Sequence, residues 1–177
     1  MGSALVTPTA PALDPGTFRA ALGRFATGVA FVTAAPGGEP AGLVVNSLAS
    51  VSLEPPLVSF CPSRTSFTWA RMRRTGRFGV SVLGRVDEAF ARRAAAAGAD
   101  RFAGLDWSPG RSGAPLLAGA LATLECEVAA EHAAGDHWIV VGRVVEASCA
   151  PSAEPLVFFA GGFGTVAPGG ASTSSRP

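Results

Sequence analysis

The stretch from Gly42 to Cys61 reads GLVVNSLASVSLEPPLVSFC, and it decides the fold and the site that the sequence predicts. Its two ends, 42–46 and 57–61, are strongly apolar runs with the length and composition of buried β-strands. A double proline at 55–56 separates them, because proline cannot donate to a sheet ladder. Between the two runs, polar side chains crowd a turn: Asn46, Ser47, Ser50 and Ser52.

On the residues alone, this polar turn has two open interpretations. Asn and Ser side chains can satisfy the local backbone through Asx- and ST-turns, and the segment is then an ordinary polar loop. Alternatively, exposed amides and hydroxyls beside an apolar wall suit a flat ring that has a polar edge and a phosphate tail.

The rest of the chain predicts a mainly β domain with short helices. Capping signals and apolar spacing predict helices over 15–28, 65–75 and 87–97. Apolar, β-branched runs predict further strands over 29–34, 78–83, 120–131, 137–148 and 156–159, and 98–119 is expected to be loop-rich. Six or seven strands that do not alternate with long helices argue against a doubly wound sheet. They favour a closed or split β-barrel with inserted helices.

The composition fits one domain and excludes several classes of function. The chain has 177 residues, of which 48% are hydrophobic and 15% charged, so we expect a partner chain to cover some apolar surface. A net charge of +1 argues against a general nucleic-acid binder. No segment reads as a membrane span or signal peptide, so we predict a cytoplasmic protein. Residues 1–13 and 167–177 are predicted to be disordered tails around a domain of 14–166.

Several catalytic classes lack the residues that they need. His132 and His137 flank a predicted hairpin turn, but no further side chains with ligand spacing complete a metal site, so we predict none. No G-x-S-x-G elbow supports serine hydrolase chemistry. The G-x-G-x-x-A match at 162–167 has no helix after it and is regarded as accidental. The three cysteines do not form a disulfide framework and are expected to be core residues: Cys61, Cys126 and Cys149.

Taken together, the chain resembles the flavin reductase family with the FMN-binding split-barrel fold, the small components of two-component flavin monooxygenases. The resemblance runs through ordered blocks over most of the chain. Besides 42–61, these blocks are FRAALGRFATGVAFVT (18–33), GRFGVSVL (76–83), DRFAGLDW (100–107), GAPLLAGALATLEC (113–126), GDHWIVVGRV (135–144) and PLVFFAGGFG (155–164).

This resemblance implies a split β-barrel, a homodimer and a reaction. The implied enzyme is an NAD(P)H-dependent flavin reductase that transfers hydride from nicotinamide C4 to flavin N5 and supplies reduced FMN or FAD to a partner monooxygenase. The homodimer interface would help to form the flavin site. Two alternatives stay open: a flavin-dependent enzyme of the same fold that acts on another substrate, and a non-catalytic flavin-binding carrier.

The resemblance also assigns candidate site residues. Positions that line the isoalloxazine ring are matched by Asn46, Ser47, Leu48, Ala49 and Ser50. Positions near the ribityl and phosphate groups are matched by Ser52, Ser63, Arg64, Ser66, Thr68 and Trp69, where a helix N-terminus would offer amides to a phosphate. Arg101 matches a basic residue near the flavin tail, and His137 a histidine that faces the nicotinamide side of the ring. The loop that contacts the nicotinamide nucleotide is matched by Gly161, Gly162, Phe163 and Gly164.

That closing loop departs from the family's pattern. Family members often carry Arg or Lys, and Tyr, in a pattern like Y-R-G-x-Y, whereas 159–163 reads FAGGF. The loss of a cation and a phenol predicts weaker charge-assisted contacts to a nucleotide phosphate. We therefore expect the departure to affect nicotinamide binding more than flavin binding.

Overall fold

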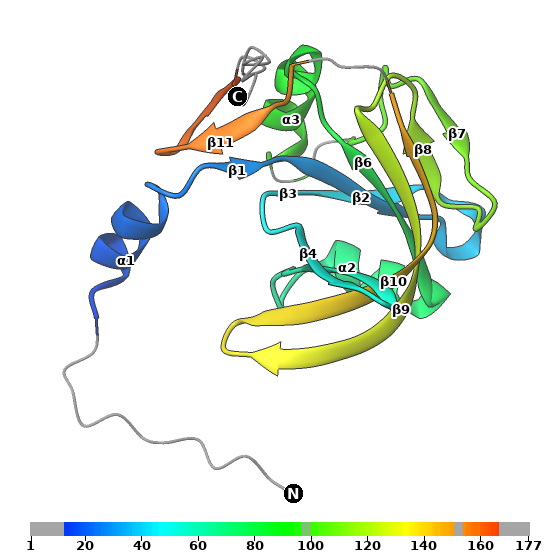
Figure 1. Cartoon of the computed structure of the whole chain (residues 1–177), viewed down its shortest axis with the longest axis horizontal. Coiled ribbons are helices and arrows are strands. Elements are labelled where there is room, and N and C mark those ends of the chain that lie inside the picture. The colour runs from blue at the N-terminus through cyan, green and yellow to red at the C-terminus, as the bar shows by residue number, and fades with distance from the viewer. Residues whose placement is uncertain (1–12, 97, 99, 151–153, 167–177) are drawn as a thin grey trace, which may run out of the picture.

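A computed structural model describes residues 13–96, 98, 100–150 and 154–166. Apart from Leu13, the predicted tails at 1–13 and 167–177 lie outside this part of the chain, so the tail and domain boundaries stay predictions. The described part is mainly β with short helices, as the sequence predicts (Figure 1).

The elements follow one another along the chain with short connections. The helices are α1 (Pro15–Leu22), α2 (Phe67–Met72) and α3 (Glu88–Ala94), with 3₁₀ turns η1 (Pro36–Gly38), η2 (Arg73–Thr75) and η3 (Arg85–Asp87). The first six strands are β1 (Thr27–Gly28), β2 (Ala30–Ala34), β3 (Ala41–Val45), β4 (Ala49–Leu53), β5 (Pro56–Phe60) and β6 (Arg77–Val82). The remaining strands are β7 (Trp107–Pro109), β8 (Pro115–Leu117), β9 (Ala122–Ala134), β10 (His137–Cys149), β11 (Val157–Phe159) and β12 (Gly162–Gly164).

One antiparallel sheet of seven strands dominates the molecule, in the order β3-β2-β6-β9-β10-β5-β4. Small sheets β1-β11-β12 and β7-β8 accompany it. The two edge strands, β3 and β4, are consecutive in the chain but do not pair with each other. The sheet is therefore not closed, so of the closed and split forms that the sequence left open, the closed barrel is excluded.

The predicted long hairpin is present and is longer than expected. β9 and β10 pair from His137 opposite Ala134 to Cys149 opposite Ala122, so the loop has two residues, Gly135 and Asp136. Irregularities of register near Gly142 and Val145 bend this hairpin, as β-bulges do. In Figure 1, the hairpin end and α1 project toward the same side of the molecule.

Three sequence predictions are wrong in their detail. The turn expected after 42–46 is a short corner, because Ala49–Leu53 forms edge strand β4 against β5. The first helix ends at Leu22 rather than near 28, with Gly23 as its C-cap. The expected loop-rich segment 98–119 contains β7 and β8. Each missed element is short, so local periodicity carries little signal for it.

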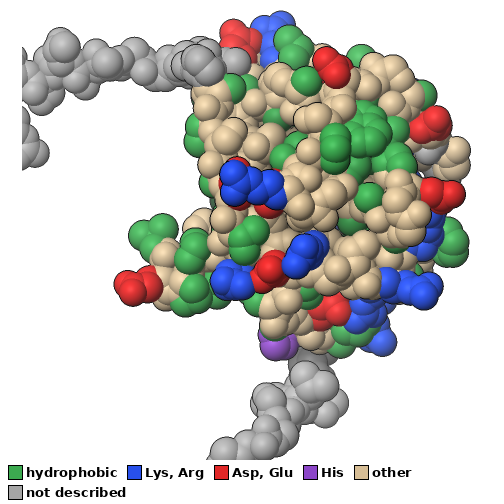
Figure 2. All heavy atoms as spheres, turned by 90° about the vertical axis from the view of Figure 1, so that its right-hand side faces the viewer, with side chains coloured by type: hydrophobic (Ala, Val, Ile, Leu, Met, Phe, Trp, Pro, Cys, Tyr) green, Lys and Arg blue, Asp and Glu red, His purple; other side chains and the backbone are tan. Residues whose placement is uncertain are grey.

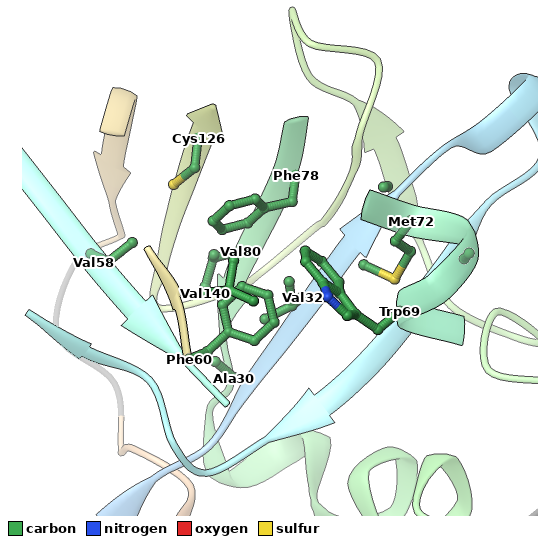
Figure 3. Packing of buried hydrophobic residues seen from close by; sticks show 12 residues of the cluster. Ala30, Val32, Val58, Phe60, Trp69, Met72, Phe78, Val80, Cys126 and Val140 are labelled. Carbon is green, nitrogen blue, oxygen red and sulfur yellow. The ribbon is translucent and has the colours of Figure 1, made fainter. Parts of the chain in front are cut away.

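The core lies on both faces of β2, the second strand of the sheet. Ala30, Val32 and Ala34 belong to one buried cluster, while Val29 and Phe31 belong to the other. This alternation follows from the two-residue period of a strand, and it explains the continuous apolar run in the sequence. In the first cluster, the rings of Phe60, Phe78 and Trp69 pack together around Val80 and Val140 (Figure 3).

A close contact between an aromatic ring and a strand joins β6 to β10. The Phe78 ring lies over Gly142, where a Cβ atom would meet the ring at 2.3 Å. Cys126 is buried beside this contact, as expected, but Cys149 is exposed, which corrects the prediction that it is a core residue.

The face of the molecule in Figure 2 carries acidic and basic side chains next to one another.

Candidate functional site

Two hollows meet at the turn that follows β3. The larger, of about 470 Å³, lies between α1, this turn and the β11–β12 hairpin, and Phe18, Leu22, Thr27, Ser47 and Gly161 are in its wall. The smaller, of about 210 Å³, is lined by Val29, Val44, Val45, Asn46, Ala95, Phe158 and Phe163. Asn46 and Phe158 line both hollows. Cofactor sites are typically concave and mostly apolar with a few polar groups, and this arrangement has that character.

The position of Asn46 follows from the end of a strand. β3 leaves the ladder after Val45, which pairs with Ala30, so Asn46 is exposed and free to point away from the sheet. The Oγ of the next residue, Ser47, accepts a hydrogen bond from the Cys61 backbone N–H at 3.0 Å. This hydrogen bond holds the turn against the end of β5 and so fixes the backbone next to Asn46.

Polar groups at the hollows are few, and one of them has no partner. The Thr27 hydroxyl is buried and makes no hydrogen bond to any residue that the structure describes. Asn46 is the only Asn of a chain without Gln, so it carries the only carboxamide side chain. An apolar wall, one carboxamide and one unpaired buried hydroxyl fit a flat ring with a polar edge, because a buried hydroxyl without a partner is costly.

A second group of predicted residues lies at the end of the β9–β10 hairpin. Ser63 forms a bridge with His137, and the Arg64 backbone N–H donates to the Asp136 carbonyl at 2.9 Å. The Ser63 and Thr65 hydroxyls lie 2.9 Å apart. These contacts hold the segment after β5 against the hairpin turn.

Two guanidinium groups contact Trp138 beside this turn. The Arg64 and Arg73 guanidinium carbons lie 5.4 Å and 4.8 Å from the centroid of the Trp138 ring. Arg73 also forms an ion pair with Glu131. The predicted phosphate neighbourhood therefore contains an aromatic face and two guanidinium groups, of which Arg73 is already paired with Glu131.

His137 is exposed, and its Nδ1 lies 2.8 Å from Asp136 Oδ1. The hydrogen bond from His137 and its charge lower the pKa of the Asp136 carboxyl. His137 does not line either hollow around Asn46. Within one described chain, the structure does not bring the predicted catalytic histidine together with the predicted ring-binding turn.

Four more predicted residues belong to the start of α2 and to the loop that follows α3. The Ser66 hydroxyl caps α2 by accepting from the Trp69 N–H at 3.1 Å, and Arg101 Nη1 donates to the Thr68 hydroxyl at 3.3 Å. Trp69 itself is only 2% exposed, and its indole N–H donates to Glu131 at 3.1 Å. The Trp69 side chain is therefore part of the core, and the position of this residue near the flavin tail stays a prediction.

The remaining candidates, three for the ring and Ser52 for the flavin tail, lie on or near edge strand β4. Leu48 packs against the first core cluster, while Ala49 and Ser50 are exposed and Ser52 is half-buried. None of these four lines a hollow at Asn46 within the described part of the chain.

The closing loop is a tight hairpin. Ala160 and Gly161 form its turn with φ values of 49° and 80°, and the Ala160 N–H donates to the Gly23 carbonyl at 2.8 Å. Gly162, Phe163 and Gly164 form β12, a strand that the sequence did not predict. The hairpin therefore joins the end of α1 to the hollows.

Sequence reasoning missed several residues that shape the site. Phe158 packs edge-on against Phe163, with ring centroids 5.5 Å apart. The Arg92 guanidinium lies over the ring of Phe163, 5.0 Å from its centroid. Thr27, Phe158 and Arg92 come from three distant segments, and the FFAGGF run at 158–163 was the one local sign of an aromatic wall.

Other kinds of site receive no support from the residues described. Among them, no group of three or more His, Cys, Asp and Glu side chains could hold a metal ion. None of the helices that the structure describes has the length and apolar character needed to cross a membrane.

Comparison with known proteins gives a consistent result. The model of the flavin reductase like domain matches residues 22–167. The reductase subunit of a flavin-dependent monooxygenase from Rhodococcus jostii is 42% identical over 159 residues, which cover 90% of this chain and 82% of that protein. An NADH-dependent FAD reductase from Streptomyces globisporus is 40% identical, with 94% and 95% covered.

Solved structures agree with the sequence comparison. The NADH:FAD oxidoreductase of Streptomyces globisporus, in complex with NAD and FAD fragments, superposes with a TM-score of 0.82 at 41% identity, over 90% of this chain and 98% of that one. A homologue of nitrilotriacetate monooxygenase component B from Mycobacterium thermoresistibile gives a TM-score of 0.83 at 38% identity, over 86% of each chain. The chain therefore belongs to the family of flavin reductase like domains.

Proposed function

We propose that this chain is an NAD(P)H-dependent flavin reductase that supplies reduced FMN or FAD to a partner monooxygenase. The observation that carries the proposal is the pair of hollows at Asn46. Their mostly apolar walls hold one carboxamide, the Arg19 side chain and the Thr27 hydroxyl, which has no hydrogen-bond partner among the described residues. The names of the relatives support the reaction and the partner, since they include monooxygenase reductase subunits and NADH-dependent reductases of FAD and FMN.

In this proposal, the protein binds and orients, and the bound cofactors supply the chemistry. Hydride transfer from nicotinamide C4 to flavin N5 is the chemistry that they bring. Asn46 and Thr27 would hold the polar edge of the flavin ring, while Phe158 and Phe163 would exclude water from one side of it. Orientation at close range can provide much of the acceleration, so no catalytic acid is required at these residues.

The flavin tail would extend from the Ser47 turn toward the hairpin end. Ser52, Ser63, Arg64, Ser66, Thr68 and Arg101 remain our proposed residues for the ribityl and phosphate groups. The charges of Arg64 and Arg101 support this proposal, because guanidinium groups bind phosphate by charge-assisted hydrogen bonds. Gly161 and Phe163 would face the nicotinamide.

We include in the proposal a homodimer with the split-barrel architecture. Phe18 and Leu22 on α1 are each 53% exposed, and Phe25 is 72% exposed, so α1 presents an apolar face that the single chain leaves uncovered. A second copy that covers α1 could also bring its hairpin end, with His137, to the nicotinamide side of the ring. The cytoplasmic location stays a prediction from the sequence.

Steady-state oxidation of NADH and NADPH with FMN or FAD tests the function. We expect the purified protein to oxidise at least one nicotinamide far faster than the uncatalysed rate, followed by the loss of reduced-nicotinamide absorbance. Flavin binding without any turnover would point to the carrier alternative, and turnover limited to another substrate would point to a different flavin enzyme. Either result contradicts the proposal.

A further inference from the structure

The closing hairpin lacks its own cation, but a cation reaches it from another element. Arg92 lies on α3, and its guanidinium carbon is 5.0 Å from the centroid of the Phe163 ring. Three residues later on the same helix face, Ala95 lines the smaller hollow beside Phe158 and Asn46. Arg92 is thus positioned at the rim of the hollow that Phe163 walls.

The Arg92 guanidinium is held in place, but only some of its N–H groups donate hydrogen bonds within the described part of the chain. Its Nε and Nη2 donate to one carboxylate oxygen of Glu88, at 2.9 Å and 2.7 Å. A guanidinium carries five N–H groups, so three remain, and no described residue accepts from Nη1. The side chain is 57% exposed, so these donors face solvent. Stacking on Phe163 and pairing with Glu88 fix the group's orientation before any ligand arrives.

We infer that Arg92 binds the pyrophosphate of the reduced nicotinamide dinucleotide and replaces the cation that the closing loop lacks. The inference rests on the proposed function, because it takes the hollow at Asn46 and Phe163 as the flavin and nicotinamide site. The smaller hollow has no charged residue in its wall, so it can hold the uncharged ring of a dihydronicotinamide. The pyrophosphate must then lie outside the apolar wall, where a fixed guanidinium can bind it.

One other cation competes for this role. Arg19 on α1 lines the larger hollow. In contrast to Arg92, it lies on the helix whose apolar face we propose to be covered by a second copy. A comparison of the two arginines therefore belongs in the test.

The test uses two hydride donors that differ in their phosphates. NADH carries the pyrophosphate, and dihydronicotinamide riboside carries no phosphate, so a phosphate contact must affect only the first. Arg92→Met retains an unbranched apolar stem over Phe163 and removes the charge. We expect it to raise the KM for NADH about tenfold, as for the loss of a hydrogen bond to a charged group, with kcat and the KM for the riboside near wild type. Arg92→Lys should recover part of the loss.

Arg85→Met is the matched control. Arg85 is 62% exposed and pairs with Glu154 at 3.0 Å, so it resembles Arg92 in exposure and pairing but does not contact Phe163. Its KM for NADH should not change. A loss of folded enzyme lowers the maximal rate but not the KM, so the KM values for the two donors can be compared within one protein.

Several results would overturn the inference. These are an unchanged KM for NADH in Arg92→Met, an equal rise for both donors, or a rise specific to NADH in Arg19→Met alone. Wild-type turnover and flavin affinity, measured in the same preparations, separate this failure from failure of the proposed function. If wild type does not oxidise NADH with any flavin, the proposed function fails. If wild type is active and Arg92→Met has an unchanged KM for NADH, only the role of Arg92 is rejected.

Discussion

Glu125 lies on β9 with only 5% of its surface exposed, and its carboxylate accepts hydrogen bonds from two backbone N–H groups of the β7–β8 turn. The donors are Arg111 at 2.9 Å and Ser112 at 2.6 Å. Burial alone would raise the pKa of Glu125, but the hydrogen bonds from Ser112 and Arg111 and the charge of Arg111 outweigh it and lower the pKa. The ionised side chain therefore fastens a hairpin whose own two strands have three residues each.

The lowered pKa predicts an acid-sensitive anchor. A carboxyl group with a depressed pKa in the folded state contributes stability above its unfolded pKa, and this contribution is lost as the pH falls through the folded value. We expect Glu125→Gln to lower the free energy of unfolding by about 1–3 kcal/mol at neutral pH and by less in acid. Urea unfolding at several pH values measures this. Glu54→Gln, at an exposed position, is the control. Equal losses for Glu125→Gln at all pH values would contradict the role of its charge.

Single residues also show why part of the site could be predicted and part could not. Asn46 and Ser47 follow an apolar run within one short segment, so local sequence shows a polar turn there, and the family resemblance assigns it to the ring. The burial of Trp69 depends on Phe60 and Glu131, which lie in other strands. Thr27 becomes a site residue only when β1 pairs with β11 beside the Asn46 turn.

At the scale of elements, length decides what the sequence could predict. The long hairpin of β9 and β10 and the buried strand β2 have clear apolar patterns, and both were predicted. β7, β8 and β12 have three residues each, which is too short for a period to be visible, and they form because other strands or core residues lie beside them. The sheet is open because edge strands β3 and β4 do not pair with each other, and the amino-acid composition does not show which strands pair.

The first helix carries a prediction at the same scale. α1 has no buried residue, although its N-cap Asp14 accepts from the Thr17 N–H at 2.8 Å and defines a regular start. If a second copy covers its apolar face, Leu22→Glu places a charge in the interface, and we expect the dimer dissociation constant to rise at least about tenfold. Sedimentation velocity over a range of concentrations measures this.

Val86→Glu is the control for the helix variant, because Val86 is 89% exposed on η3, away from α1. It should leave the dimer unchanged. A wild-type monomer, or equal effects of the two substitutions, would contradict the proposed interface.

At the scale of the whole molecule, the curled sheet brings segments from the start, the first third and the end of the chain to one place. The end of β3, strand β1, helix α1 and the β11–β12 hairpin surround the hollows at Asn46, while the long hairpin projects toward the same side (Figure 1). The flavin tail would then lie between the Ser47 turn and the hairpin end. The fold of the family thus positions these segments, and a few side chains of this chain determine which ligand binds between them.

The placement of the flavin ring at Asn46 is the central claim, and equilibrium titration of FMN and FAD into wild type and Asn46→Ala tests it most directly. Asn46 is exposed, so its replacement should leave the fold intact. Ser108→Ala, an exposed substitution on β7, is the control. We predict that Asn46→Ala weakens binding of the preferred flavin about tenfold while Ser108→Ala has no effect. Equal flavin affinity in wild type and Asn46→Ala would contradict the account.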